Sequence, residues 1–449
     1  MITDMTYGSP LKRIFSYFFP LLFSTVFQQL YSITDSVIVG KFISKNALAA
    51  VNSTTTLNWM IFSFIIGFVT GEGVLVSRAF GAKDFKKMRN CIANGIYVAV
   101  FVGVIITFFA LVFIKRILVV MDVPQEIFSD TYTYIFIIMA GYPVTIASSY
   151  IGMLIQSVGD GSNAMIRGIF STVVNIVMDL VFVIVFNMGV EGVAIATVLS
   201  NAINFVIALI FYIKKYEILH IGKSDFKFNK FIVKKTILIG LPNGLQSSVT
   251  MLGCTLVQGS VNALGTNYIA AYSTALKIEN MVTMPLMALA NSMPPFVAQN
   301  YGAHKVDRIK KSLKQVLLIA VIYGAVIGVL LRFLGEKIAL MYLNSNETQT
   351  LELINYYFLF SGTLLFMLCV LYVIRSTITS LGFSAFTALG GLVELGCRLF
   401  VVFALVGNIG YTAICISNPM SWFFTSAMLF IAYFTYIKRK FKEIEKTSG

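Results

Sequence analysis

Long apolar stretches without a single charged residue constrain this chain more than any other feature. The runs 90–114 and 131–159 contain no Asp, Glu, Lys or Arg, and similar runs recur to the end of the sequence. A helix that crosses a bilayer needs about 20 apolar residues. Over its 449 residues the chain is 57% hydrophobic and 12% charged, whereas soluble domains contain about 25% charged residues. The sequence therefore predicts an all-α, polytopic membrane protein.

The charge-free runs divide into about twelve transmembrane helices, six in each half. They lie at 14–34, 46–71, 90–114, 131–159, 168–190 (interrupted by Asp179), 192–213, 236–276, 280–303, 315–331, 353–374, 376–393 and 399–437. The run 236–276 is long enough for one helix, a turn near Asn262–Asn267 and the start of the next helix. The last run is expected to break at Gly407–Gly410.

The distribution of basic residues predicts the orientation. If the N-terminus is cytoplasmic, 25 of the 34 Lys and Arg residues fall in cytoplasmic segments, 6 in outer loops and 3 within the membrane. Lys and Arg accumulate on the cytoplasmic side of membrane proteins. We therefore expect a multi-pass protein of the cytoplasmic membrane with both termini inside. The same bias accounts for the net charge of +14 without a nucleic-acid partner.

An internal repeat predicts two equivalent halves. The segment 78–84 (RAFGAKD) is matched about 221 positions later by 299–308 (QNYGAHKVDR). The predicted domains are an N-terminal six-helix bundle (1–213), a solvated cytoplasmic linker (214–235) and a C-terminal six-helix bundle (236–449). With six helices each, the two pseudo-symmetric bundles would share one topology, a known plan among transporters.

A few ionisable residues lie inside the apolar runs, where they are expected to be functional. Asp35 and Asp179 have no basic residue within one helical turn, and Asn175 shares a helix face with Asp179 because it lies four residues earlier. With Thr197 on the next helix, they offer oxygen donors that suit Na⁺ or a shared proton. The alternative is that backbone groups or water neutralise each acid separately.

The remaining charges in the apolar runs have local interpretations. Glu394 and Arg398 are spaced for an ion pair on one helix. Glu279 is expected either to line a cavity or to be neutralised locally. Glu72 and Arg375 lie nearer the cytoplasmic ends of their runs and are expected to extend to water.

Signals of catalysis or of metal binding are almost absent. Both histidines, His220 and His304, fall in expected cytoplasmic loops, and the five cysteines have no metal-ligand spacing. The sequence thus predicts a protein that is not an enzyme, without cofactor or disulfide and with no metal beyond a possible Na⁺. An integral-membrane transferase would need a catalytic polar cluster that the loops do not provide.

In its motifs the sequence resembles the multidrug and toxic compound extrusion (MATE) transporters, especially their DinF- and MepA-like branch. The resemblance covers nearly the whole chain, and five segments carry it in order. These are Gln28–Asp35, Phe80–Asp84, the Asn175/Asp179 pair, Gly192–Thr197 and Gln299–Ala303.

The resemblance implies that drug export is coupled to inward Na⁺ or H⁺. It also implies a cation site in the N-terminal half, whose family positions match Asp35, Asn175, Asp179 and Thr197. Other branches carry an acid on helix 7, but here that helix reads Leu241–Ser248 and has none. The N-terminal site is therefore expected to act alone.

The expected function is an antiporter that exports small organic cations by alternating access from a cavity between the halves. Candidate cavity residues are Gln28, Gln246 and Glu279. The expected protein is a monomer, with membrane lipid as its surroundings. The alternative is a flippase for a lipid-linked precursor, which would need several basic residues in its cavity.

Overall fold

All secondary structure in the described part of the chain is helical. The computed structural model describes residues 2–343 and 347–448. The first half contains α1 (Pro10–Ile38), η1 (Val39–Ile43), α2 (Lys45–Gly81), α3 (Phe85–Val120), α4 (Gln125–Ala140), α5 (Tyr142–Ser157), α6 (Gly161–Leu180), η2 (Val181–Val185), α7 (Val190–Lys215), η3 (Glu217–Leu219) and η4 (Lys223–Asp225).

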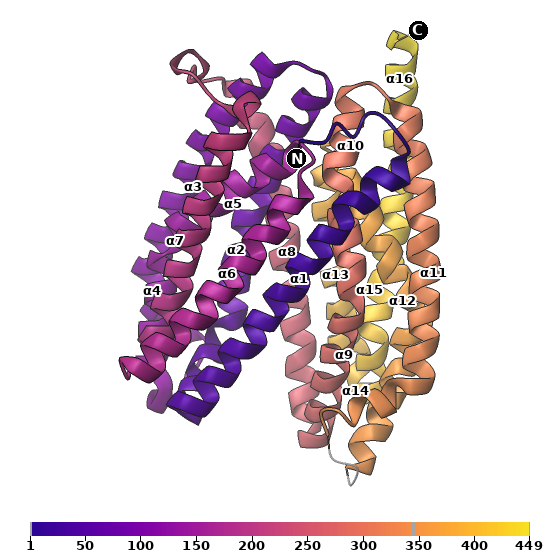
Figure 1. The fold of residues 1–449 in the computed structure, drawn as a ribbon. Helices are drawn as coiled ribbons and strands as arrows, with labels where there is room; N and C mark the ends of the chain where they lie inside the picture. The colour runs from indigo at the N-terminus through magenta and orange to yellow at the C-terminus, as the bar shows by residue number, and fades with distance from the viewer. Residues whose placement is uncertain (1, 344–346, 449) are drawn as a thin grey trace. The chain divides into compact units, whose positions relative to one another are not determined.

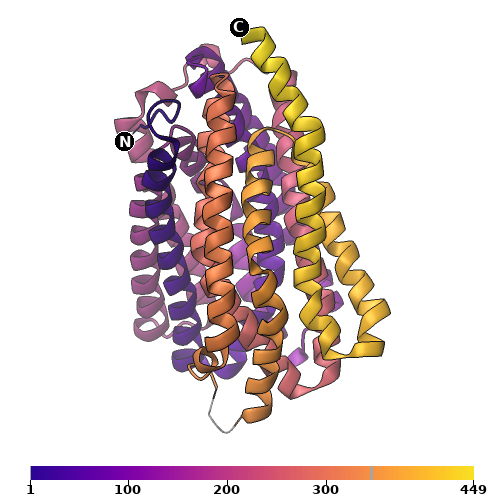
Figure 2. The same ribbon diagram turned by 90° about the vertical axis from the view of Figure 1, so that its right-hand side faces the viewer.

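The second half is built from elements of similar length (Figure 1). They are α8 (Lys230–Leu264), α9 (Thr266–Asn291), α10 (Met293–Gly302), α11 (Val306–Ala339), α12 (Thr348–Ser380), α13 (Ser384–Phe400), η5 (Val401–Leu405), α14 (Val406–Ile409), α15 (Tyr411–Ala432), η6 (Tyr433–Ile437) and α16 (Lys438–Ser448). Figure 2 shows α15, η6 and α16 as one continuous helix that ends at the C-terminus. The elements η1, η2, η5 and η6 are single π-helical turns: η1 and η2 end the helices that begin with α1 and α6, whereas η5 and η6 continue into α14 and α16.

The described residues contain somewhat fewer candidate membrane spans than the predicted number of about twelve. Within the described residues, nine helices are long and apolar enough to cross a bilayer, or ten spans if α4 and α5, bent by 45°, form one. The first long helix of each half, α1 and α8, has 29 and 35 residues but does not meet this criterion. Counting both gives twelve segments. The prediction of an all-α polytopic membrane protein is confirmed.

The chain divides into two compact units. Unit 1 comprises residues 1–5 and 16–244, and unit 2 comprises 6–15 and 245–449. The boundary thus lies inside α8, after Gly244, and not in the predicted linker at 214–235. In unit 1, the buried cluster of apolar side chains comes mainly from α2, α3, α4, α5 and α7. In unit 2, α11 and α12 approach closely, because a Cβ at Gly328 would lie 2.1 Å from the carbonyl oxygen of Gly362.

Polar caps and glycines fix the helix ends. Ser44 and Asp84 accept hydrogen bonds from the backbone N–H groups of Ala47 and Lys87, at 3.0 and 2.9 Å. Such caps satisfy donors that have no partner inside the helix. Gly265 separates α8 from α9 with φ of +112°, and Gly410 precedes α15 with φ of +52°. Both breaks lie where the sequence predicted them.

The connector between the halves is folded and not simply solvated. Leu219 is fully buried, and its carbonyl oxygen accepts a hydrogen bond of 2.7 Å from the Tyr212 hydroxyl. Asn94 of α3 donates to the carbonyl oxygen of Lys227 and accepts from the N–H of Asn229, at 3.1 and 2.7 Å. These contacts hold the segment on unit 1. A single sequence does not reveal them, because the partners are far apart along the chain.

Candidate cation site

The predicted site residues in unit 1 lie on α1, α6 and α7. Asp35 is near the C-terminal end of α1, and Asn175 and Asp179 lie one turn apart on α6. Asp179 has no exposed surface, and Asn175 and Asp35 are 2% and 8% exposed. Asp35 and Asp179 are close enough for their charges to interact. Both carboxyl groups are therefore buried within range of each other's charge, and their role as a cation site stays a prediction.

Thr197 joins this group through a tyrosine that the sequence analysis missed. The hydroxyl groups of Thr197 and Tyr31 lie 3.2 Å apart and share a hydrogen bond. Tyr31 also interacts electrostatically with Asp35 and Asp179. Since Tyr31 precedes Asp35 by four residues, their shared helix face could have revealed it. Tyr134 of α4 interacts with the same groups, but no sequence pattern links it to them.

The site is short of hydrogen-bond partners. Both carboxyl oxygens of Asp179, both polar side-chain atoms of Asn175 and Oδ1 of Asp35 are buried without a partner among the described residues. Buried polar groups in folded proteins nearly always have a partner, so each exception calls for an explanation. Four oxygens and one amide nitrogen in an otherwise apolar helix bundle fit a small cation or a proton with water. No group of three or more His, Cys, Asp or Glu residues within the described ranges could hold a metal ion.

Single π-helical turns follow the acids on both helices. In the chain, η1 begins four residues after Asp35 and η2 begins two residues after Asp179. The two segments contact each other, and η1 also contacts α7. Turns of this kind locally widen a helix and are frequent at functional sites. They distinguish the C-terminal ends of these two helices from the regular α-helix before them.

In unit 2, the helix that corresponds to α6 is α13, and it carries an acid whose charge is neutralised by basic residues. The carboxylate of Glu394 pairs with the guanidinium of Arg375 and, at 3.6 Å, with that of Arg398. It also accepts a hydrogen bond of 2.9 Å from the Thr250 hydroxyl. The predicted Glu394–Arg398 pair is therefore present. The expectation that Arg375 extends to water is wrong, because Glu394 holds its guanidinium.

Two other charged residues of unit 1 lie deeper than the sequence suggested. Arg167, assigned to a cytoplasmic segment, is buried in α6 and donates hydrogen bonds to the side-chain oxygens of Asn163 and Asn204, at 2.8 and 3.2 Å. Glu72 is 2% exposed and does not extend to water. Position near a helix end predicted exposure for both residues, but neighbouring helices cover them.

The candidate cavity residues have different surroundings. Gln28 is exposed on α1. In unit 2, Gln246 is buried and donates a hydrogen bond of 3.0 Å to the Thr250 hydroxyl. Glu279 is buried and accepts one of 3.1 Å from the Tyr357 hydroxyl. Their role in a substrate cavity stays a prediction.

Similarity to known proteins covers most of the chain. The MatE family model matches residues 20–181 and 239–403. The probable multidrug resistance protein YoeA of Bacillus subtilis (strain 168) is 26% identical over 336 residues, which are 73% of each chain. The multidrug export protein MepA of Staphylococcus haemolyticus (strain JCSC1435) is 26% identical over 327 residues, 72% of each chain.

Solved structures agree with this assignment at the level of the fold. A crystal structure of MATE in the bent conformation matches with a TM-score of 0.88 and 19% identity, and the match covers 99% of this chain and 98% of that one. The family model matches both halves and more than half of the residues. Proteins of this family are transporters and not enzymes. The chain therefore belongs to the MatE family, the multidrug and toxic compound extrusion transporters.

Proposed function

We propose that this protein is an antiporter that exports small organic, mainly cationic, compounds across the cytoplasmic membrane in exchange for H⁺ or Na⁺. The observation that carries the proposal is the set of five buried polar atoms of Asp35, Asn175 and Asp179 that have no partner among the described residues. In a membrane, such a set is unfavourable unless a cation or proton and water occupy it during the transport cycle. The multidrug export relatives supply the class of compound.

Coupling requires that the ion binds one conformation more tightly than the other. The carboxyl groups of Asp35 and Asp179 belong to different helices, α1 and α6. An ion held by both stabilises the arrangement in which they are close. Release of the ion leaves two neighbouring carboxylates that repel each other. We infer that this difference drives alternating access in a single chain whose termini are both cytoplasmic.

The charges of unit 2 favour coupling through unit 1 alone. Glu394 is already neutralised by Arg375 and Arg398. An inward cation would have to compete with two guanidinium groups for that carboxylate. By contrast, Asp35 and Asp179 are buried and form no ion pair within the described residues.

The test is efflux of ethidium from energised vesicles, with Na⁺ and pH gradients imposed separately. We expect one gradient to drive efflux by the parent protein and neither gradient to drive efflux by Asp179→Asn. The matched control is Glu126→Gln, which changes an exposed acid of α4 and should leave efflux unchanged. Undiminished coupled efflux by Asp179→Asn would contradict the proposal.

The same vesicles separate the antiporter from a lipid flippase. A flippase for an anionic lipid-linked precursor needs unpaired basic residues in its cavity, but Arg375 and Arg398 both bind Glu394. We therefore expect no precursor translocation. Translocation of such a lipid without ethidium efflux under either gradient would favour the flippase.

A further inference from the structure

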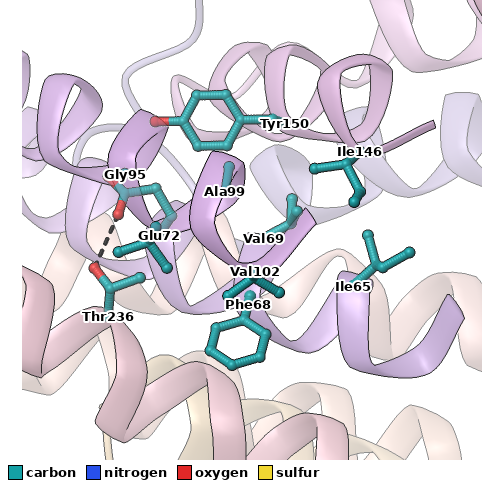
Figure 3. A pocket seen from close by; sticks show the side chains of 11 residues that line it. Ile65, Phe68, Val69, Glu72, Gly95, Ala99, Val102, Ile146, Tyr150 and Thr236 are labelled. Atoms are coloured by element: carbon teal, nitrogen blue, oxygen red, sulfur yellow. Dashed lines mark hydrogen bonds between the residues drawn. The ribbon is translucent and has the colours of Figure 1, made fainter. Parts of the chain in front are cut away.

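Glu72 of α2 is a buried acid that the proposed cation site does not include. One carboxyl oxygen, Oε2, accepts a hydrogen bond of 2.9 Å from the hydroxyl of Thr236 on α8 (Figure 3). The other oxygen, Oε1, is buried without a hydrogen-bond partner in the described chain. Both residues belong to unit 1. Within the described residues, the protein therefore provides a hydrogen bond to Oε2 but none to Oε1.

A small cavity adjoins this carboxyl group. It offers about 10 Å³ for the centre of a water molecule and is lined by Glu72, Thr236, Tyr150 and apolar side chains such as Val69 and Ile146. Figure 3 shows these side chains around the carboxyl group. A buried space of about 10–15 Å³ is needed to hold one water. The cavity thus fits a single water beside a single carboxylic acid.

The helices around Glu72 do not offer it a positive partner. The titratable groups that interact with it are the thiol of Cys91 on α3 and the hydroxyl of Tyr150 on α5. Tyr150 already donates its hydrogen bond to the carbonyl oxygen of Ile92, at 2.6 Å. Around Cys91 lie three charged groups, Lys87, Asp84 and Lys235. Within the described residues none of them forms an ion pair with Glu72. An ionised carboxylate in such a site costs several kcal/mol more than the neutral acid.

The hydrogen bond of Glu72 spans an unusually close helix contact. A Cβ at Gly71 would lie 2.8 Å from both the amide nitrogen of Gly240 and the carbonyl oxygen of Thr236. One turn away, a Cβ at Gly67 would lie 2.5 Å from the amide nitrogen of Gly244. The backbones of α2 and of the start of α8 therefore touch over two turns. Close contacts between glycines leave no room for water or for a displaced side chain.

We propose that Glu72 is a second proton-binding site, separate from Asp35 and Asp179, and that its proton keeps the start of α8 in contact with α2. The carboxyl group binds one proton at Oε1, and the resulting O–H donates a hydrogen bond to a water in the adjoining cavity. Loss of the proton leaves a buried negative charge that draws in more water. The contact between α2 and residues 230–244 of α8 then opens. The inference does not depend on which compound the protein transports.

Infrared difference spectroscopy of the purified full-length protein tests the proton site. The C=O band of a protonated carboxylic acid should be present at neutral pH and disappear as the pH is raised. Glu72→Gln should remove this band, whereas Asp35→Asn/Asp179→Asn should retain it. Thr236→Val, which removes the hydrogen-bond donor, should shift its frequency. If the spectra of Asp35→Asn/Asp179→Asn and of the triple variant with Glu72→Gln are the same, Glu72 is not the proton site.

Hydrogen exchange tests the coupling to α8. After correction for the intrinsic pH dependence of exchange, amides of 232–244 in the parent should lose protection as Glu72 deprotonates. Glu72→Gln keeps an acceptor for Thr236 but cannot ionise, so its protection should not change with pH. An equal change in both proteins would overturn the coupling. If Glu72→Gln does not fold, the pH dependence of the reaction of Glu72 with a carbodiimide is measured in the parent protein instead. The site is then rejected if labelling does not fall with rising pH.

Discussion

At the scale of single residues, the two halves place opposite chemistry at equivalent positions. Asn175 and Asp179 of α6 are followed by η2, and 219 positions later Glu394 and Arg398 of α13 are followed by η5. The first pair has no hydrogen-bond partners in the described chain, whereas Glu394 has two basic partners. The proposed function uses the first pair for ion binding, whereas the second pair forms an ion pair within unit 2.

Removal of the charge of Glu394 should strongly destabilise unit 2. In Glu394→Gln, the buried guanidinium groups of Arg375 and Arg398 lose their counter-charge. Breaking a buried ion pair by removing one partner costs about 3–5 kcal/mol. Thermal unfolding in detergent should show a much lower Tm than in Glu352→Gln, which changes an exposed acid of α12. Equal Tm values for the two variants would contradict this role.

Asp160 should contribute stability that depends on pH. Burial raises the pKa of this carboxyl group, but interactions with its ionised form, which include hydrogen bonds from the Tyr216 hydroxyl and the Asn163 N–H, lower the pKa below the ordinary 3.8. The folded state therefore favours the ionised form. The resulting stability is fully present above about pH 3.8 and is lost as the pH falls through the pKa of the folded state.

The variant Asp160→Asn should be less stable than the parent at neutral pH by about 1–2 kcal/mol. Unfolding curves recorded at decreasing pH should show this difference shrinking below pH 3.8. A difference that stays constant across this range would show that the charge of Asp160 does not contribute.

At the residue level, the sequence predicted burial correctly where an isolated acid lies deep in an apolar run. Asp35 and Asp179 stand out for that reason, and Asn175 follows from helical spacing. It failed for Glu72 and Arg167, whose partners Thr236 and Asn204 lie on other helices. One sequence does not show which helix covers a residue near a helix end.

At the scale of elements, close contact between glycines determines how the start of α8 packs in unit 1. Gly67 and Gly71 are spaced by one turn on α2, as are Gly240 and Gly244 on α8. This small-xxx-small spacing lets membrane helices approach closely. Pro242, between the two glycines of α8, removes one backbone hydrogen bond from the same turn. The start of α8 is thus tightly packed and locally weakened at the same place.

Addition of one methyl group at this contact should be costly. In Gly67→Ala the new Cβ would lie 2.5 Å from the amide nitrogen of Gly244, and overpacking of this kind costs about 1–3 kcal/mol. The control is Gly259→Ala on α8, because nothing lies within 4 Å of a Cβ built at Gly259. We expect Gly67→Ala to lower the Tm and Gly259→Ala to leave it equal or higher. The opposite order would show that this contact adapts easily.

Helix limits were largely predictable, but π-helical turns were not. The end of α8 and the start of α9 follow from Gly265 with its positive φ, and the N-terminal caps of α2 and α3 follow from Ser44 and Asp84. The segments η1 and η2 consist of ordinary apolar residues with one lysine. Since no residue type marks a π-helical turn, packing against neighbouring helices must produce them.

At the scale of the whole molecule, the orientation of the termini stays a prediction. If α1 and α8 cross the membrane together with the ten candidate spans, the chain has twelve segments and both termini lie on one side. The excess of basic residues in the expected cytoplasmic loops then predicts that this side is the cytoplasm. The burial of Arg167 removes one residue from this excess without changing its sign.

Reporter fusions should confirm this topology. A fluorescent protein fused after residue 449 should be fluorescent, and alkaline phosphatase at the same place should be inactive. Fusion after Gly265, at the break between α8 and α9, should give the reverse result because an odd number of segments, seven, would precede it. Active phosphatase at the C-terminus would contradict the predicted orientation.

The loops after α2 and α10 preserve one backbone shape with different side chains. Lys83 and His304, 221 positions apart, both have φ of 57°. The N–H groups of Asp84 and Lys305 bond to the carbonyl oxygens of Ala79 and Asn300 at 3.0 and 2.9 Å, again 221 positions apart. Such agreement is what the duplication of a half-length gene would leave. An ancestral half with an even number of spans could be joined to its copy on one side of the membrane without inverting either. After that fusion, each copy was free to lose what the other retained.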